Sequence, residues 1–226
     1  MIYKYKELLI IMAVLDQEKI WDELAGEWNK FRTSPPAEII EFLKNNSGKI
    51  LDLGCGSGRN LVDNKNIDYY GVDFSEEMLK FAEKNAETKK IKALFFKESA
   101  DKLSFQDNFF DGAIFVSTLH CMPSPKSREN SLKELHRVMK KDSEALVSVW
   151  DKKETGNLEK TRTKEGNVIW KKDGKNYPRY YYFYDEKELS DILEKVGFKI
   201  LKIVNKDSQT LIGSHARKNL LFYVKK

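Results

Sequence analysis

The chain has 226 residues, of which 41% are hydrophobic and 12% aromatic, and its formal net charge is +5. This length suits one sizeable domain with a buried core. The apolar run at 8–14 falls far short of the roughly 20 residues that span a bilayer, so no membrane segment is expected. Cys55 and Cys121 match neither a zinc-ligand spacing nor a disulfide framework, which favours a cytoplasmic protein without a metal.

Residues 17–45 are predicted to be helical, with a break at Pro35-Pro36. Apolar side chains recur at helical spacing on both sides of the break, and prolines are well tolerated in the first turn of a helix. A domain spanning 17–226 is therefore expected, with residues 1–16 as an N-terminal extension.

Strands and helices then alternate along the chain. The expected elements are strands at 49–53, 69–73, 93–96, 112–117 and 144–150, with helices beginning at 59–62 and spanning 75–85 and 125–139. A helix at 185–196 and strands at 198–204 and 219–224 follow a basic segment at 151–182. This order predicts an α/β fold, namely a Rossmann-like, doubly wound, mostly parallel seven-stranded sheet with one antiparallel strand.

A glycine-rich loop, Gly54-Cys55-Gly56-Ser57-Gly58, follows the first strand. The dinucleotide-binding pattern places its last glycine where this chain has Arg59. The strand ends in Asp52, whose carboxylate would face a phosphate unfavourably but suits a ligand with an amino group. The methionine end of S-adenosylmethionine is such a ligand, and glycines let the backbone approach it closely.

A second acidic residue, Asp73, ends the next strand. A carboxylate at that place can accept hydrogen bonds from both ribose hydroxyls of a nucleotide. Together, Asp52, the three glycines and Asp73 predict S-adenosylmethionine as the cofactor.

Four segments extend this prediction: ILDLGCGSGRNL, YYGVDFSEEML, KESADKLSFQDNFFDGAI and LKELHRVMKKDSEALVSVW. They are similar to successive motifs of class I S-adenosylmethionine-dependent methyltransferases and cover residues 49–150. The resemblance implies that the cofactor is bound by Asp52, Gly54, Cys55, Gly56, Gly58, Asp73, Phe74, Met78, Ser99, Ala100, Asp101 and Val116. Ser99, Ala100 and Asp101 would border the adenine, and Val116 would lie on the sulfonium side. The family often has Asp where Ser99 stands, so Asp101 or a backbone group would have to bind the adenine amino group.

Three further stretches resemble the tRNA wobble-uridine carboxymethyl methyltransferases: residues 21–35, residues 118–120, and residues 179–184 with Glu188-Leu189. Tyr182 replaces the histidine that is usual in that family. The resemblance implies formation of a methyl ester on a 5-carboxymethyl group, with Arg32, His120 and Arg179 holding the carboxylate or nearby phosphates. The tyrosines at 180–184 could stack an anticodon base or simply pack in the core.

The basic segment 151–182 has nine basic residues against five acidic ones, which fits either a solvated loop or contact with the tRNA anticodon loop. The third strand usually lies at the sheet edge in this fold, where Leu94-Phe95-Phe96 would be exposed. Members of the resembled family pair with a small zinc-binding activator protein, and strand addition at this edge would be a physical reason for it.

Two other functions remain open. A small-molecule O-, N- or C-methyltransferase would explain the cofactor loop and His120, but it leaves the basic segment without a role. A catalytically silent cofactor-binding or RNA-binding module is the other, although the intact Asp52, glycines and Asp73 argue against loss of the cofactor.

Overall fold

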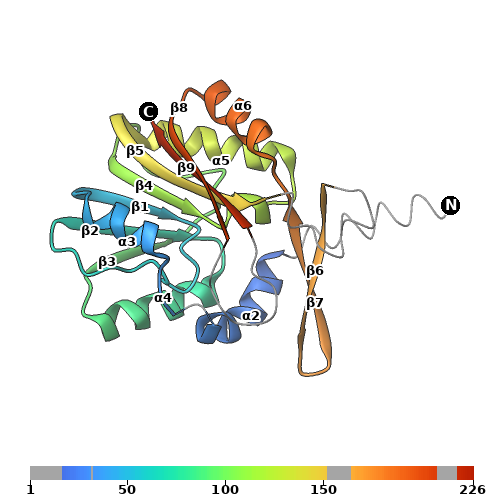
Figure 1. Cartoon of the computed structure of the whole chain (residues 1–226). Coiled ribbons are helices and arrows are strands. Elements are labelled where there is room, and N and C mark those ends of the chain that lie inside the picture. Colours follow the sequence, from blue (N-terminus) through green and yellow to red (C-terminus); the bar gives the residue numbers. More distant parts are fainter. Residues whose placement is uncertain (1–16, 32, 152–163, 208–217) are drawn as a thin grey trace.

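The computed structural model describes residues 17–31, 33–151, 164–207 and 218–226 (Figure 1). Its main sheet has the strand order β3-β2-β1-β4-β5-β9-β8. The strands are β1 (Gly48–Leu53), β2 (Ile67–Asp73), β3 (Ala93–Lys97), β4 (Phe110–Val116), β5 (Met139–Trp150), β8 (Lys199–Asp207) and β9 (Lys218–Lys225). Strands β1 to β5 pair in parallel, and β9 lies antiparallel to both β5 and β8. The predicted sheet, with its one antiparallel strand, is confirmed.

Helices cover both faces of this sheet. They are α2 (Gln17–Phe31), α3 (Ala37–Lys44), α4 (Glu76–Lys89), α5 (Pro125–Val138) and α6 (Glu186–Val196), with a short 3-10 turn η1 (Leu119–Cys121) after β4. Neighbouring residues of β1 point to opposite faces: Ile50 packs with α3, and Leu51 packs with α5 and α6. Strands buried on both faces explain the nearly continuous apolar runs of β4 and β5.

The helix ends follow their capping residues. Ser75 accepts a hydrogen bond from the backbone N–H of Met78, and Asp185 accepts one from that of Glu188. Gly197 ends α6 in the left-handed region at φ 114°. Within the described chain, we find no helix of the length and apolarity that a membrane crossing requires.

The helix predicted to begin at 59–62 is wrong, because the structure has turns there and no helix between β1 and β2. Gly58 has φ +75°, and a Cβ at this glycine would lie 3.1 Å from the backbone of Ala82 in α4. Asn60 turns its side chain back to Asp52, and Asn64 donates hydrogen bonds to two backbone carbonyls of the preceding segment. Side-chain hydrogen bonds to nearby groups therefore replace helical ones.

The described part of the basic segment forms a β-hairpin that its charge pattern did not reveal. Strands β6 (Glu165–Lys172) and β7 (Lys175–Tyr182) pair antiparallel in a separate sheet, which projects beside α2 in Figure 1. The turn is Asp173-Gly174, and both residues have positive φ, as two-residue hairpin turns favour. Residues 152–163 of this segment, the extension 1–16 and Arg32 lie outside the described residues.

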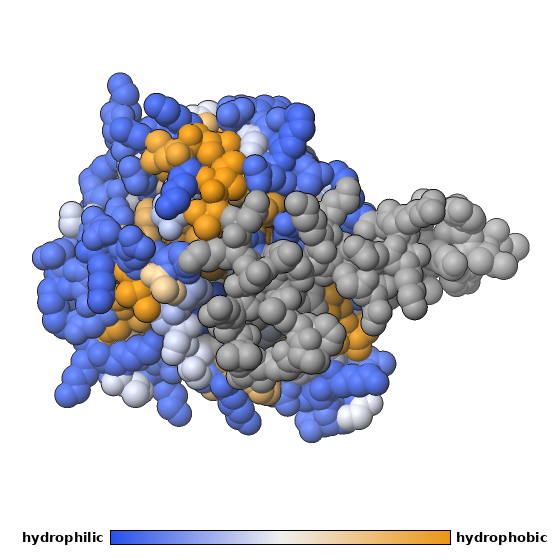
Figure 2. All heavy atoms as spheres, in the orientation of Figure 1, coloured by the Kyte–Doolittle hydropathy of each residue, from blue (hydrophilic) through white to orange (hydrophobic). Residues whose placement is uncertain are grey.

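Exposed apolar side chains lie at both edges of the main sheet. Strand β3 is an edge strand, as predicted, and Leu94 on it is 49% exposed. On the opposite edge strand, β8, Leu201 is 43% exposed. The face seen in Figure 2 is mostly hydrophilic, with hydrophobic atoms gathered over β8 and β9.

Candidate active site

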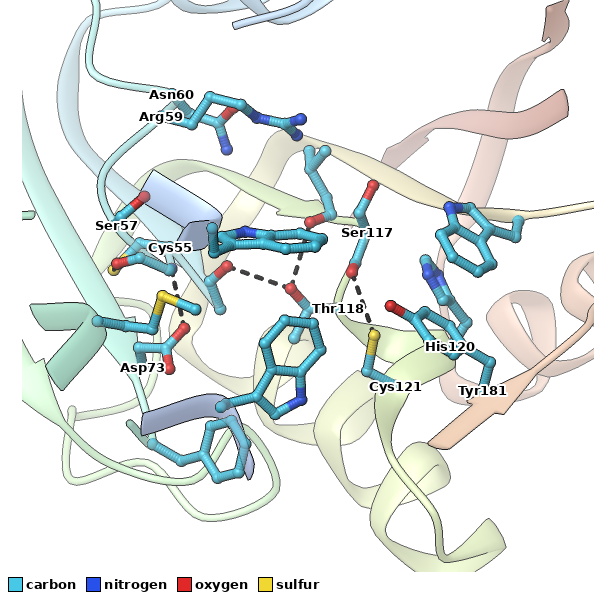
Figure 3. A pocket seen from close by; sticks show the side chains of 18 residues that line it. Cys55, Ser57, Arg59, Asn60, Asp73, Ser117, Thr118, His120, Cys121 and Tyr181 are labelled. Atoms are coloured by element: carbon cyan, nitrogen blue, oxygen red, sulfur yellow. Dashed lines mark hydrogen bonds between the residues drawn. The ribbon is translucent and has the colours of Figure 1, made fainter. Parts of the chain in front are cut away.

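A cavity lies at the carboxyl ends of β1, β2 and β4, where α/β sheets bind their ligands (Figure 3). A second cavity adjoins it, because both are lined by Gly54, Asp73, Phe74, Thr118 and Cys121. The predicted cofactor residues that line the first cavity are Gly54, Cys55, Gly56, Asp73, Phe74, Met78 and Val116. Those that line the second are Gly54, Asp73, Phe74, Ser99 and Ala100. Asp52, Gly58 and Asp101 line neither.

Gly54 is the position in the loop where a side chain cannot be accommodated. Its φ is +74°, and a Cβ there would lie 2.3 Å from side-chain atoms of Thr118. The Thr118 hydroxyl also donates a hydrogen bond of 3.1 Å to the Gly54 carbonyl. The loop thus packs directly against the end of β4, which brings Val116 and His120 into the same cavity.

Asp73 lies between the two cavities and lines both. Its carboxylate accepts hydrogen bonds from the backbone N–H of Gly56 (2.8 Å) and of Ser75 (2.9 Å). Burial raises the pKa of Asp73 to about 6, while those backbone hydrogen bonds lower it. A carboxylate fixed in this way at the junction can meet a ribose on its remaining lone pairs.

Asp52 is fully buried behind the loop. It accepts hydrogen bonds from the Tyr69 hydroxyl and from the Asn60 amide, the latter at 3.2 Å. Burial raises the pKa of Asp52 to about 6, although both hydrogen bonds act in the opposite direction. Asn60, rather than Asp52, lines the cavity, and the sequence pattern did not single it out.

Two other predicted cofactor residues lie away from the cavity walls. Gly58 packs against α4, so its lack of a side chain lets the loop approach the helix. Asp101 accepts a hydrogen bond of 2.5 Å from the hydroxyl of Ser99, which does line the second cavity. Asp101 therefore orients Ser99 rather than facing the cavity itself.

Aromatic rings form the wall opposite the glycine loop. Trp150 and Tyr181 stack with ring centroids 4.1 Å apart, and His120 stacks on both, 4.9 Å from Trp150 and 5.5 Å from Tyr181. His120 is completely buried yet lines the cavity. Trp21 and Trp28 of α2 complete the wall, although on sequence grounds they resemble ordinary core residues of an amphipathic helix.

Arg179 lies behind this wall and does not line the cavity. We use the name aromatic box for the four rings around its guanidinium: Trp21 at 5.6 Å, Trp28 at 5.5 Å, Trp170 at 5.0 Å and Tyr181 at 5.2 Å. The guanidinium donates a 2.7 Å hydrogen bond to the Tyr181 hydroxyl, and its Nε has no acceptor in the described chain. No acidic side chain among the described residues forms an ion pair with it, although Arg179 is only 5% exposed.

Both cysteines line the cavity as free thiols. Burial raises the pKa of Cys121 to about 12 and raises that of Cys55 well above its ordinary value. Both thiols are therefore protonated at neutral pH, and neither is suited to act as a nucleophile.

Comparison with known proteins agrees with this geometry. A family model for a methyltransferase domain matches residues 50–142. The chain is 29% identical to an uncharacterized protein of Methanocaldococcus jannaschii, over 98% of this chain and 91% of that protein. It is 28% identical to the tRNA (carboxymethyluridine(34)-5-O)-methyltransferase of Macaca fascicularis, over 68% of this chain but only 23% of that longer protein. A solved S-adenosylmethionine-dependent methyltransferase of Methanosarcina mazei has a TM-score of 0.70 at 24% identity, and the match covers 85% of this chain and 98% of that one.

Fold, cavity and domain match together define an S-adenosylmethionine-dependent methyltransferase. The residues present fit that cofactor, since the Asp73 carboxylate can accept hydrogen bonds from ribose hydroxyls, Ser99 offers a hydroxyl in the second cavity, and polar side chains of the glycine loop line the first. Similarity to the jannaschii protein extends over almost the whole chain, whereas similarity to the tRNA enzyme is confined to part of each protein.

Proposed function

We propose that this methyltransferase esterifies the carboxylate of 5-carboxymethyluridine at the wobble position of tRNA. The observation that carries the proposal is Arg179, a buried cation that has no acidic partner among the described residues. Leaving a charge buried without a counter-ion is costly, so the site favours an anionic acceptor. The similarity to tRNA carboxymethyluridine methyltransferases supports the same acceptor.

The chemistry asks little of the protein beyond positioning. A carboxylate with an ordinary pKa of about 4 is already ionised at neutral pH, so no general base is needed. When bound, S-adenosylmethionine supplies an electrophilic methyl group, and transfer breaks one C–S bond while forming one C–O bond. Because opposite charges are neutralised in this step, a dry site that holds the reactants in line provides most of the rate.

Arg179 is proposed to hold the acceptor carboxylate through its free Nε side. The planar guanidinium suits a carboxylate better than an ammonium does, because it offers parallel N–H donors. Trp21, Trp28 and Tyr181 stand between Arg179 and the cavity, so a carboxylate that enters between these rings would be removed from water. His120 is proposed to shape the acceptor side of the cavity. Arg32, the third predicted substrate residue, lies outside the described residues and keeps its proposed role.

The hairpin is proposed to contact the tRNA backbone. Lys171 and Lys175 are exposed near its tip, while Lys172 donates a hydrogen bond of 2.6 Å to the Glu23 carbonyl in α2. Basic side chains on a projecting element can neutralise phosphates around the anticodon loop.

A small zinc-binding activator remains part of the proposal as a partner at the edge strand β3. Leu94 is half exposed there, and the open backbone of an edge strand can pair with a strand of another protein. Co-elution of this chain with a candidate activator during gel filtration would support that partner. Separate elution would exclude the activator from the proposal.

A small-molecule acceptor is the second candidate function. The observation in its favour is the enclosed aromatic wall, because His120 and Tyr181 are almost inaccessible to solvent. A flat, compact molecule would enter such a cavity more easily than a nucleotide within a tRNA.

Labelled cofactor distinguishes these functions. The protein is incubated with tRNA that carries carboxymethyluridine, with and without the activator. Alkali-labile label on tRNA is the expected result, because methyl esters hydrolyse in alkali. Alkali-stable label would indicate methylation of ring or ribose atoms instead of the carboxylate. The absence of label on tRNA under both conditions would overturn the proposal in favour of a small-molecule acceptor.

A further inference from the structure

A separate cleft lies where the base of the β6–β7 hairpin meets α5 and α6 (Figure 1). Its volume of about 550 Å³ is within the range of small-molecule sites. None of the described residues that line it also lines either of the two cofactor cavities. Among the described residues, basic and acidic side chains contribute equally to its walls: Arg128, Lys164, Lys195, Glu129, Glu165 and Glu188.

Strand β7 separates this cleft from the active site. Neighbouring side chains of a strand point to opposite faces, so Tyr181 lines the first cofactor cavity while Tyr182 lines the cleft. Tyr180 lies on the cleft side as well, since its hydroxyl accepts a 3.2 Å hydrogen bond from Arg128. The proposed function involves Arg179 and Tyr181, which leaves the tyrosines on the opposite face of β7 without a role.

Arg128 indicates what the cleft can bind. It is 7% exposed, and within the described part of the chain it forms no ion pair. Its Nη1 donates hydrogen bonds to the backbone carbonyls of Met122 and Pro123 and to the Tyr180 hydroxyl, whereas Nε and Nη2 have no acceptor among the described residues. The Tyr182 ring lies 4.0 Å from the guanidinium carbon and holds its plane. The Nε and Nη2 edge offers two parallel N–H donors, which fit an anionic group in a bidentate manner.

A carboxylate lies close to this guanidinium. The Tyr180 hydroxyl accepts from Arg128 and donates to Glu165, so one hydroxyl bridges the two opposite charges. The other two carboxylates of the cleft are each paired with a lysine, at 3.1 Å and 3.3 Å. A purely anionic ligand, such as a nucleic-acid phosphate, would be repelled by Glu165. A ligand with a carboxylate for Arg128 and an ammonium group for Glu165 matches both charges.

We propose that this cleft binds a free α-amino acid, with its carboxylate on the Nε and Nη2 edge of Arg128 and its ammonium group at Glu165. The two charged groups of an α-amino acid are separated by one carbon atom, which suits protein charges that are bridged by one hydroxyl. Pro125 and Ile192 provide apolar surface for the side chain of the ligand. The site lies outside the catalytic cavity, and it does not depend on the tRNA acceptor of the proposed function.

Calorimetric titration of the full chain with each of the standard protein amino acids tests this site. Saturating S-adenosylhomocysteine is present throughout, because a free amino acid could otherwise enter the part of the cofactor cavities that takes the methionine end. At least one amino acid is expected to bind with a Kd below about 1 mM. If none of them binds in this range, the proposal is overturned.

The amide of the best-binding amino acid then tests the contact with Arg128 in the unmodified protein. It keeps the ammonium group but lacks the negative charge, so it should bind about tenfold more weakly or worse. The deaminated acid tests Glu165 in the same way and should lose affinity to a similar degree. Equal binding of the amide and the amino acid would overturn the assignment to Arg128, and equal binding of the deaminated acid would overturn that to Glu165.

Arg128→Met and Lys126→Met form a matched pair, because each removes one positive charge near the start of α5 and Lys126 is exposed and does not line the cleft. Arg128→Met should weaken amino-acid binding about tenfold or more, and Lys126→Met should change it by less than about twofold. Both variants should keep their affinity for S-adenosylhomocysteine. Equal amino-acid binding by the two variants would contradict the proposal. If Arg128→Met does not unfold cooperatively, the comparison of amino acid and amide decides, and since no tRNA is present, failure of the tRNA reaction leaves every outcome unchanged.

Discussion

The two sides of the active site bury charges of opposite sign by different means. The glycine-loop side buries the carboxylates of Asp52 and Asp73 beneath hydrogen-bond donors. On the other side, α2 and the β6–β7 hairpin bury the guanidinium of Arg179 among aromatic rings. Buried charges are expensive unless they are compensated, so each side is matched to a ligand of the opposite charge. The cofactor brings the positive charge, and the proposed acceptor brings the negative one.

The largest effect is expected at Gly54, on which the loop side depends. Gly54→Ala would combine a left-handed backbone with a clash against Thr118, at a combined cost of about 2–4 kcal/mol. We expect binding of S-adenosylhomocysteine to fall by about 100-fold or more. Gly56→Ala is the matched control, because its φ is +54° but a Cβ would meet nothing within 4 Å. Equal effects of the two substitutions in calorimetry and chemical unfolding would show that the Thr118 contact is unimportant.

Arg179→Met tests the side of the active site that is formed by the aromatic box. We expect methyl transfer to a carboxylate acceptor to fall by roughly 100-fold, because the acceptor loses a charged hydrogen bond in a dry site. Stability should change by less than about 1 kcal/mol or improve, since a thioether among aromatic rings replaces a cation without an acidic partner. Arg179→Lys keeps the charge but loses the planar donors, so it should recover only part of the activity. If S-adenosylhomocysteine binding falls as much as activity, the division of the site into two sides is wrong.

Asp52→Asn tests whether the buried negative charge of Asp52 lowers the stability of the folded protein. Burial raises the pKa of Asp52 from an ordinary 3.8 to about 6, so between these values the folded state binds more protons than the unfolded state. This group therefore lowers stability progressively as pH rises from about 4 to 6, and its full cost is present above pH 6. Without ligand, the variant should be about 1–3 kcal/mol more stable than the parent at pH 8, with the difference vanishing near pH 4.

Urea unfolding at both pH values measures this difference. Asp68→Asn on β2 is a suitable control, because Asp68 is exposed. A variant that is less stable than the parent at pH 8 would contradict the expected cost of the Asp52 charge.

The smallest effect is expected at the tip of the hairpin. Lys171→Glu with Lys175→Glu should lower tRNA affinity by roughly tenfold at low salt and flatten its dependence on salt concentration. S-adenosylhomocysteine binding should not change, because neither lysine lines the cavity. Lys84→Glu on α4 serves as a charge-reversal control away from the hairpin. Unchanged tRNA binding in the hairpin variant would separate the basic segment from the substrate.

The two sides also differ in how far their sequence predicts them. The glycine loop depends on residues that are close together in the chain and on backbone conformation, and Gly54, Gly56 and Asp73, which the sequence predicts to bind the cofactor, all line the cavity. The sequence-based prediction of this loop is wrong where residues of other elements contact it. Tyr69 from β2 helps to hold Asp52 behind the loop, and the turns around Gly58 and Asn60 replace the expected helix.

The aromatic box could not be derived in the same way, because it joins α2 to a hairpin far along the chain. Trp21 and Trp28 have the spacing of core residues, and only the tertiary structure places them against Arg179. The hairpin itself has a local signal in Asp173-Gly174, a residue pair that two-residue hairpin turns favour, but the charge of the segment alone does not indicate a hairpin. The structure also shows how the box is held, since Trp170 donates a 2.6 Å hydrogen bond to Glu27 of α2.

The turns between β1 and β2 limit what this protein could be redesigned to bind. Residues 54–66, all of which the structure describes, contain no helix, so no helix dipole from this segment points at the cavity. Dinucleotide enzymes use such a helix N-terminus to hold the pyrophosphate. Replacing Arg59 with glycine would complete the dinucleotide pattern on paper, yet it would not create a phosphate site. Changing the cofactor would require building a new helix after the loop, with Asp52 removed from beneath it.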